Sequence, residues 1–248
     1  MHIIYILWLR QMKKYRRSGV RMVMSLVQPL VYFLTLGFGF NALFQQAGRG
    51  SYVQFVVPGV IAQTILFTSI FWGINVMWDK QFGFLKETLV APVSRVKVML
   101  GGSLGGATIA VIQGMALFAI ALIFGFRPYN WGMLLLTLAI MSMLAITMVS
   151  FSSGIGSVVN DMQAFMALTN FLVIPLFFLS SALFPLENVP RVMKAIAYAN
   201  PLTYAVDAMR ASLVNQGHFS IWTDLSVMLG LMLLLLYFSI YRFKRIQA

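Results

Sequence analysis

The 248-residue chain has no cysteine, two histidines and only six acidic residues. Without cysteine there is no disulfide framework, no thiolate metal site and no cysteine nucleophile. The two isolated histidines, His2 and His218, make a zinc site improbable. Charged residues make up 10% of the chain and hydrophobic residues 60%. Because soluble domains usually carry about 25% charged and about 45–50% apolar residues, this composition predicts a membrane protein.

The sequence also lacks the motifs that would supply energy or catalysis. It has no Gly-Lys dipeptide, so it has no Walker A loop for ATP. No carboxylate, Lys, Arg or His falls in the interior of a predicted hydrocarbon span, which argues against a carrier driven by ions. Its serines have no neighbouring His or Lys to act as a base. We therefore expect a chain that is not an enzyme, with no catalytic, cofactor-binding or metal-binding residue, and an energy source in another protein.

Six stretches with few charges divide the chain. A helix needs about 20 apolar residues to cross about 30 Å of hydrocarbon, and the stretches are of about this length or longer. They predict an all-α membrane domain with six transmembrane helices, at residues 22–44, 54–78, 98–124, 132–156, 163–184 and 221–241. In the last of these, Asp224 is expected at the headgroup level.

The distribution of Lys and Arg predicts the orientation. With the N-terminus in the cytoplasm, 13 of the 18 Lys and Arg residues lie on the cytoplasmic side. Positive residues favour that side, so we expect both termini in the cytoplasm. This topology explains the net charge of +12 without a nucleic-acid partner, and no nucleic-acid-binding motif accompanies it.

Residues 1–19 are predicted to form an amphipathic helix ahead of the first span. An apolar stripe at helical spacing lies mostly opposite the basic residues and consists of Ile4, Leu7, Trp8, Met12 and Tyr15. We expect this helix to lie in the cytoplasmic headgroup layer with Trp8 and Tyr15 dipping inward. The pattern is compatible with a lipid anchor and with a lateral contact for a cytoplasmic partner.

Residues 79–91, between the second and third spans, are predicted to form a short cytoplasmic helix. Phe82, Leu85 and Leu89 share one face of it, and Lys86 and Glu87 lie away from that face. Pro92 ends the helix, because the residue before a proline is disfavoured in helical geometry. The apolar face indicates a protein-binding surface, although contact with the bilayer would also bury it.

The outer segment, residues 185–217, is too short in each of its helical parts to cross the membrane. Asn200 and Pro201 form a helix start, and an apolar stripe follows at Leu202, Val206, Met209 and Leu213. Asp207 and Arg210 are expected to pair on its polar side. We expect re-entrant or interfacial helices that cap the outer end, or a lid that does not touch substrate.

Small residues recur every four positions in the third predicted span. They are Gly102, Gly106, Ala110 and Gly114, with an overlapping pair at Gly101 and Gly105. This spacing lets helix backbones approach closely and predicts helix packing at Gly102, Gly106 and Gly114. It is not a dinucleotide-binding fingerprint.

Three segments together resemble the ABC-2 type permeases of bacterial ABC exporters, especially the drug-resistance and nodulation-factor export branch. The segments are residues 55–59 (FVVPG), residues 84–94 (FLKETLVAPVS), and residues 183–190 (LFPLENVP) with residues 200–204 (NPLTY). The resemblance implies a multi-pass half-transporter of the bacterial inner membrane. It would pair with a second permease, preferably an identical one, and with two copies of a separate cytoplasmic ABC ATPase that binds ATP and Mg²⁺.

The resemblance also implies roles for three sets of residues. Residues 79–91 would be the coupling helix, with Phe82, Leu85, Lys86, Glu87 and Leu89 contacting the ATPase. The N-terminal segment would be the connecting helix, with Arg10, Lys13, Lys14, Arg16 and Arg17. Asn200, Pro201 and Tyr204 would belong to the outer re-entrant cap.

An amphipathic or lipid-like cargo, such as a drug-like molecule or a lipid-linked oligosaccharide, fits the side chains of the spans. Those side chains include Gln63, Thr64, Asn75, Gln113, Met166 and Asn170. A polysaccharide-export permease of the same family, a membrane scaffold without transport and an ion-coupled carrier are the alternatives. The residues do not identify the cargo.

Overall fold

The computed structural model describes residues 2–46, 48, 50–81, 94–186 and 189–244. All regular structure in these ranges is helical, which confirms the predicted all-α class. The helices are α1 (His2–Arg17), α2 (Gly19–Gly39), α3 (Asn41–Gln46), α4 (Tyr52–Gln81), α6 (Arg95–Ile123), the 3₁₀ turn η1 (Trp131–Met133), α7 (Leu134–Val158), α8 (Met162–Phe178), α9 (Arg191–Ala199), α10 (Pro201–Val214) and α11 (Ile221–Lys244).

Five helical stretches in the described ranges are long and apolar enough to span a membrane: α2, α4, α6, η1 with α7, and α11. The fifth predicted span, 163–184, differs from the structure. Its helix α8 has 17 residues and ends at Phe178, so it measures about 26 Å at about 1.5 Å per residue. After it, Ser180 donates a hydrogen bond to the carbonyl of Phe177 and accepts one from the amide of Ala182. This local turn competes with further helix.

The first predicted span also differs, because residues 22–44 do not form one helix. Helix α2 ends at Gly39 and the short helix α3 follows. The chain then reverses through Gly48 and Gly50, whose φ angles of 69° and 78° favour glycine. The side-chain oxygen of Asn41 accepts a hydrogen bond of 3.0 Å from the amide of Tyr52 and holds the reversal closed.

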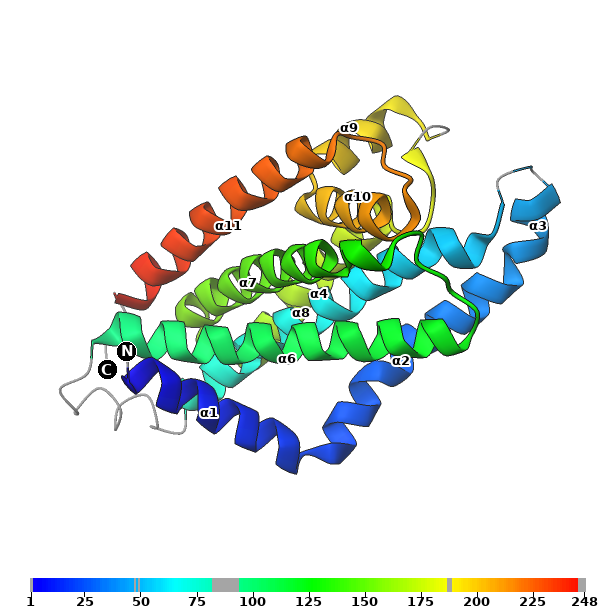
Figure 1. Ribbon diagram of the computed structural model, residues 1–248. Coiled ribbons are helices and arrows are strands. Elements are labelled where there is room, and N and C mark those ends of the chain that lie inside the picture. Colours follow the sequence, from blue (N-terminus) through cyan, green and yellow to red (C-terminus); the bar gives the residue numbers. More distant parts are fainter. Residues whose placement is uncertain (1, 47, 49, 82–93, 187–188, 245–248) are drawn as a thin grey trace.

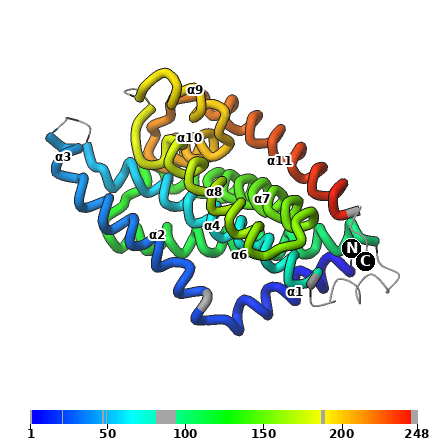
Figure 2. The backbone as a smooth tube through the Cα atoms, turned by 180° about the vertical axis from the view of Figure 1, so that it is seen from behind, coloured from blue at the N-terminus to red at the C-terminus, as the bar shows by residue number. Residues whose placement is uncertain are grey.

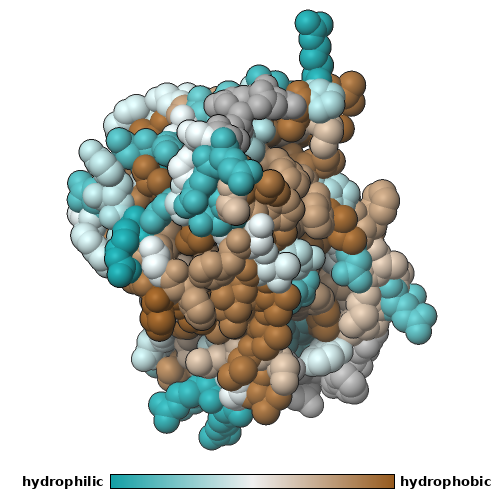
Figure 3. Space-filling model, turned by 90° about the vertical axis from the view of Figure 1, so that its right-hand side faces the viewer, coloured by the Kyte–Doolittle hydropathy of each residue, from teal (hydrophilic) through white to brown (hydrophobic). Residues whose placement is uncertain are grey.

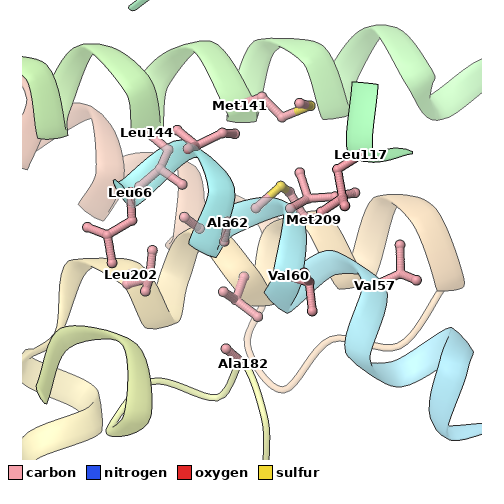
Figure 4. Close-up of a cluster of buried hydrophobic side chains, with 14 of the residues drawn as sticks. Val57, Val60, Ala62, Leu66, Leu117, Met141, Leu144, Ala182, Leu202 and Met209 are labelled. Carbon is pink, nitrogen blue, oxygen red and sulfur yellow. The ribbon is translucent and has the colours of Figure 1, made fainter. Parts of the chain in front are cut away.

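Helix α4 forms the centre of the bundle. In its most apolar window 83% of the residues are buried, against 17% in α2 and in α11. Figure 4 shows the core around it, where α4 side chains such as Val60 and Leu66 meet residues of α6, α7 and α10. The core therefore lies along one side of α2 and α11, whose other sides are exposed.

Different elements lie at the two ends of the bundle. Both termini and the last turn of α4 lie at one end, and α3, α9 and α10 lie toward the other (Figures 1 and 2). Figure 3 looks onto the second end, where hydrophilic residues lie mostly along the edges around a hydrophobic centre.

Candidate functional site: an amphipathic cavity between α1, α2, α4, α6 and α8

A cavity of about 520 Å³ lies where α1, α2, α4, α6 and α8 meet. This volume is typical of sites for drug-sized ligands. Its apolar and aromatic lining comes largely from α4 and includes Phe67, Phe71, Trp72, Ile74 and Trp78. Its polar lining includes Gln11, Lys14, Tyr15, Ser18, Ser25, Gln28, Thr68, Asn75 and Gln113. Such a lining suits a ligand with both polar and apolar parts.

Close contact between α4 and α6 shapes one wall of the cavity. A Cβ atom on Gly106 would lie 2.5 Å from Cδ2 of Trp72, so the indole rests directly on the α6 backbone. One on Gly114 would lie 2.6 Å from the methyl carbon of Met141, whereas one on Gly102 would meet Trp72 at an ordinary 3.8 Å. Two of the three predicted packing glycines thus sit where a side chain would collide.

Gln113 joins three helices at the polar wall. Its Nε2 donates to the hydroxyl of Tyr15 at 2.8 Å and to the hydroxyl of Ser25 at 2.5 Å. Its Oε1 is buried and has no hydrogen-bond partner within the described residues. Burial raises the pKa of Tyr15, so its phenol is neutral at physiological pH.

Three of the six polar or soft residues that the sequence suggested for cargo contact line this cavity: Asn75, Gln113 and Met166. Gln63 and Thr64 are 1% exposed and lie elsewhere in the bundle. Asn170 is exposed on α8. Periodicity alone could not separate these groups, because Thr64 and Asn75 share one face of α4 and differ in their position along the helix.

The N-terminal helix α1 packs against protein. A Cβ atom on Gly101 would lie 2.8 Å from Cβ of Leu7, and one on Gly105 equally close to Cβ of Gln11. Trp8 donates a 3.0 Å hydrogen bond from its indole to Thr108. Trp8 and Tyr15, which we expected to dip inward from the headgroup layer, both make hydrogen bonds to residues of α6.

The basic residues of α1 border a second hollow of about 540 Å³, lined by Ile6, Leu9, Arg10, Lys13, Lys14, Arg17 and Ser18. Arg16, which the sequence grouped with them, is exposed and does not line it. Arg10 lies 3.8 Å from the carboxylate of Asp79 at the end of α4. The sequence pattern found the basic face of α1 but not this partner.

The predicted coupling residues Phe82, Leu85, Lys86, Glu87 and Leu89 lie outside the described residues. Asp79 and Lys80, the first residues of the predicted coupling helix, continue α4. The ammonium group of Lys80 donates to the side-chain oxygen of Asn160 in the α7–α8 turn. The last turn of α4 is thus tied to α1 through Asp79 and to the α7–α8 turn through Lys80.

At the end of the bundle away from the termini, the predicted helix start is confirmed. Asn200 accepts a 3.0 Å hydrogen bond from the amide of Leu202, and Pro201 occupies the first turn of α10. The amide group of Asn200 also donates to the carbonyl of Leu176 in α8, at 2.6 Å. Tyr204 donates to the carbonyl of Tyr198 at 2.6 Å and so ties α10 to α9.

Asp207 and Arg210 do not pair on a polar face as predicted. Both are buried, and each binds backbone groups. Asp207 accepts hydrogen bonds of 2.8–2.9 Å from the amides of His218 and Phe219. Arg210 donates to the carbonyl of Ser181 at 2.8 Å. Buried irregular backbone needs such partners, which explains why the two charges are drawn apart.

The guanidinium of Arg210 also lies 4.0 Å from the centre of the Phe55 ring. Burial lowers its pKa to about 10, so Arg210 stays charged at neutral pH. Asp224, which the sequence predicts at the headgroup level, is fully buried within the protein, and neither of its oxygens has a hydrogen-bond partner in the described ranges. A single sequence shows no signal that separates such a buried carboxylate from one at the headgroups.

The fold and the cavity define a multi-pass helical membrane protein with an internal amphipathic site. A family model described as ABC-2 type transporter matches residues 2–214. The chain belongs to this family, which confirms the resemblance seen in the sequence.

Curated relatives include transport permeases from several sources. The chain is 26% identical over 214 residues to the putative transport permease ycf38 of Cyanophora paradoxa, covering 84% of this chain and 72% of the relative. It is 22% identical over 212 residues to nodulation protein J of Rhizobium leguminosarum bv. viciae, covering 84% and 81%. It is 25% identical over 209 residues to the daunorubicin resistance ABC transporter permease protein DrrB1 of Streptomyces coeruleorubidus, covering 82% and 72%.

Proposed function

We propose that this chain is the membrane subunit of an ATP-driven exporter that moves an amphipathic or lipid-like substrate across the bacterial cytoplasmic membrane. Membership of the ABC-2 family supports a transport role. The cavity of about 520 Å³, with aromatic side chains on α4 and amide and hydroxyl groups around them, is the observation that carries the substrate class. Because the chain has no Walker A motif, the proposal assigns ATP and Mg²⁺ binding to a separate ATPase subunit.

Two copies of the chain with two copies of the ATPase are the proposed assembly. Helices α2 and α8 both border the cavity, and both expose large apolar residues such as Val23 (60% exposed) and Phe171 (75% exposed). A second copy that packs against these faces would enclose the cavity. Both termini share one end of the bundle, which fits their proposed place in the cytoplasm.

The deciding experiment is copurification of the full chain with a candidate ABC ATPase from the same organism, followed by ATP hydrolysis in liposomes. Hydrolysis that an amphipathic substrate stimulates supports the exporter. If the chain instead copurified with other proteins but with no ATPase, and deleting the chain left export of such compounds unchanged, it would be identified as a scaffold.

Substituting Leu85 by aspartate is expected to abolish substrate-stimulated ATP hydrolysis while leaving the chain inserted in the membrane. In the proposed coupling helix, a charge on the apolar face would weaken ATPase binding by about 2 kcal/mol or more, which is at least tenfold. Glu87→Arg is expected to uncouple transport in the same way, by reversing a charge beside that face. Stimulated hydrolysis and ATPase recruitment are the two measurements.

Ser94→Ala is a suitable control for Leu85→Asp, since Ser94 lies just after the same segment and caps α6. This change affects the start of a helix but introduces no charge on the proposed contact. Normal efflux and normal ATPase recruitment in the Leu85 and Glu87 variants would refute the coupling role.

A further inference from the structure

The aromatic cavity and the basic hollow of α1 meet at the junction of α1 and α2. Lys14 and Ser18 line both. Lys14 is exposed, and Ser18 is the residue between the two helices. A ligand at this junction would therefore reach cationic side chains in one direction and aromatic side chains in the other.

The net charge at this junction is positive. Four of the seven residues that line the hollow are basic: Arg10, Lys13, Lys14 and Arg17. The described residues place one carboxylate against them, that of Asp79, which pairs with Arg10 and also interacts electrostatically with Lys14. The hollow keeps a positive excess, and such excess attracts phosphate or carboxylate headgroups at the cytoplasmic surface of a membrane.

The cavity side supplies a place for an apolar chain and for one hydrogen-bond donor. Phe67, Phe71 and Trp72 form an apolar wall on α4. Gln113 is 2% exposed, and its Nε2 is held by the hydroxyls of Tyr15 and Ser25. Its Oε1 remains without a donor within the described residues. A buried acceptor without a donor is costly, so a ligand hydroxyl or amide N–H would be favoured there.

We infer that the α1–α2 junction binds an anionic amphiphile, with its acidic headgroup against Lys14 and the neighbouring basic residues and its apolar chain in the aromatic cavity. A hydroxyl or amide N–H close to the headgroup donates to Gln113 Oε1. The inference rests on the proposed function, because it names the ligand class of the cavity that the exporter would use.

Trp72 provides a direct reporter of the bound chain. It lines the cavity and is only 8% exposed, so a chain bound in the cavity lies closer to it than chains in the surrounding bilayer. The full chain, with its other four tryptophans changed to phenylalanine, is placed in nanodiscs of unlabelled phosphatidylcholine. Phosphatidylglycerol with brominated chains, or phosphatidylcholine with the same chains, is then added, and quenching of Trp72 fluorescence is measured.

We expect brominated phosphatidylglycerol to quench Trp72 at a mole fraction at least about tenfold lower than brominated phosphatidylcholine. Lys14→Glu is expected to remove this preference, and Lys14→Arg to keep it. Lys97→Glu is the matched control. It makes the same charge change at an exposed site near the start of α6 that lines neither hollow, so it should leave the preference intact.

Two further lipids separate the parts of the ligand. Phosphatidylmethanol has the same anionic phosphate but no hydroxyl donor, and it should bind about fivefold more weakly than phosphatidylglycerol. Millimolar inorganic phosphate should not displace the brominated lipid, because the apolar chain contributes to binding.

Equal quenching by the two brominated lipids, or an unchanged preference in Lys14→Glu, would overturn the inference. Displacement by inorganic phosphate alone would overturn it too, since the site would then recognise only the headgroup. The measurement needs neither ATP nor the ATPase. A negative result therefore leaves the exporter proposal standing, and failure of the ATPase copurification leaves the binding result standing.

Discussion

Replacing Gly59 by alanine is expected to destabilise the protein by about 3 kcal/mol or more, which corresponds to a fall of roughly 6–12 °C in unfolding temperature. A Cβ atom at this position in α4 would lie 2.4 Å from the carbonyl oxygen of Ala182 and 2.8 Å from its Cα. These are backbone atoms, so no side chain can rotate away to relieve the overlap. Thermal unfolding of the full chain in detergent, followed by intrinsic fluorescence, measures the effect.

The matched control for Gly59→Ala is Gly230→Ala in α11. A Cβ atom there meets nothing within 4 Å, and alanine favours a helix over glycine by about 1 kcal/mol. Its unfolding temperature should stay the same or rise. If Gly59→Ala unfolded at the wild-type temperature, the close approach of α4 to the segment after α8 would be refuted.

Replacing Arg210 by alanine is expected to cost about 3 kcal/mol or more, because it leaves a cavity and a buried carbonyl without its donor. Arg210 is 5% exposed, donates to Ser181 and stacks on Phe55. Lysine should restore only part of the loss, since its ammonium group cannot stack as a planar guanidinium does. The same thermal unfolding measurement applies.

Arg127→Ala is the control for the buried arginine. Arg127 also donates to two carbonyls, those of Leu122 and Phe126, but it is exposed to solvent. Water can replace an exposed donor, so this change should cost less than about 1 kcal/mol. Equal losses in the two alanine variants would mean that burial of Arg210 does not set its contribution.

Two of the sequence segments that carry the family resemblance lie against each other at the end of the bundle away from the termini. Residues 55–59 begin α4, and residues 183–190 follow the turn after α8. In the structure Gly59 lies against Ala182, and the hydroxyl of Tyr52 donates to the carbonyl of Leu183 at 2.9 Å. Arg210 of α10 binds beside both. The motifs are therefore parts of one packing unit.

The sequence predicted the features that depend on local physics. Long apolar runs gave the spanning helices, and Asn200 with Pro201 gave the start of α10, since both signals act within one helix. Four-residue glycine spacing marked the α6 faces that receive Trp72 of α4 and Leu7 of α1. It could not show which helix would occupy each face.

Features that depend on tertiary contacts were not predictable in this way. The end of α8 at Phe178 depends on a side-chain turn within an apolar run. The partners of Asp207 and Arg210 are backbone groups up to 155 residues away along the chain. The cavity itself collects residues from five helices, and its polar wall depends on Gln113 reaching Tyr15 and Ser25 across helix boundaries.

The contacts at the end of α4 connect the proposed ATPase-binding segment to two other parts of the bundle. Asp79 and Lys80 precede the proposed ATPase contact, and they bind Arg10 of α1 and Asn160 of the α7–α8 turn. A pull on the following segment would act on both neighbours at once, and α1 would carry α6 with it through their glycine contact. A displacement of the last turn of α4 would then move α1 and α6 on one side of the cavity and the α7–α8 turn on the other side at the same time.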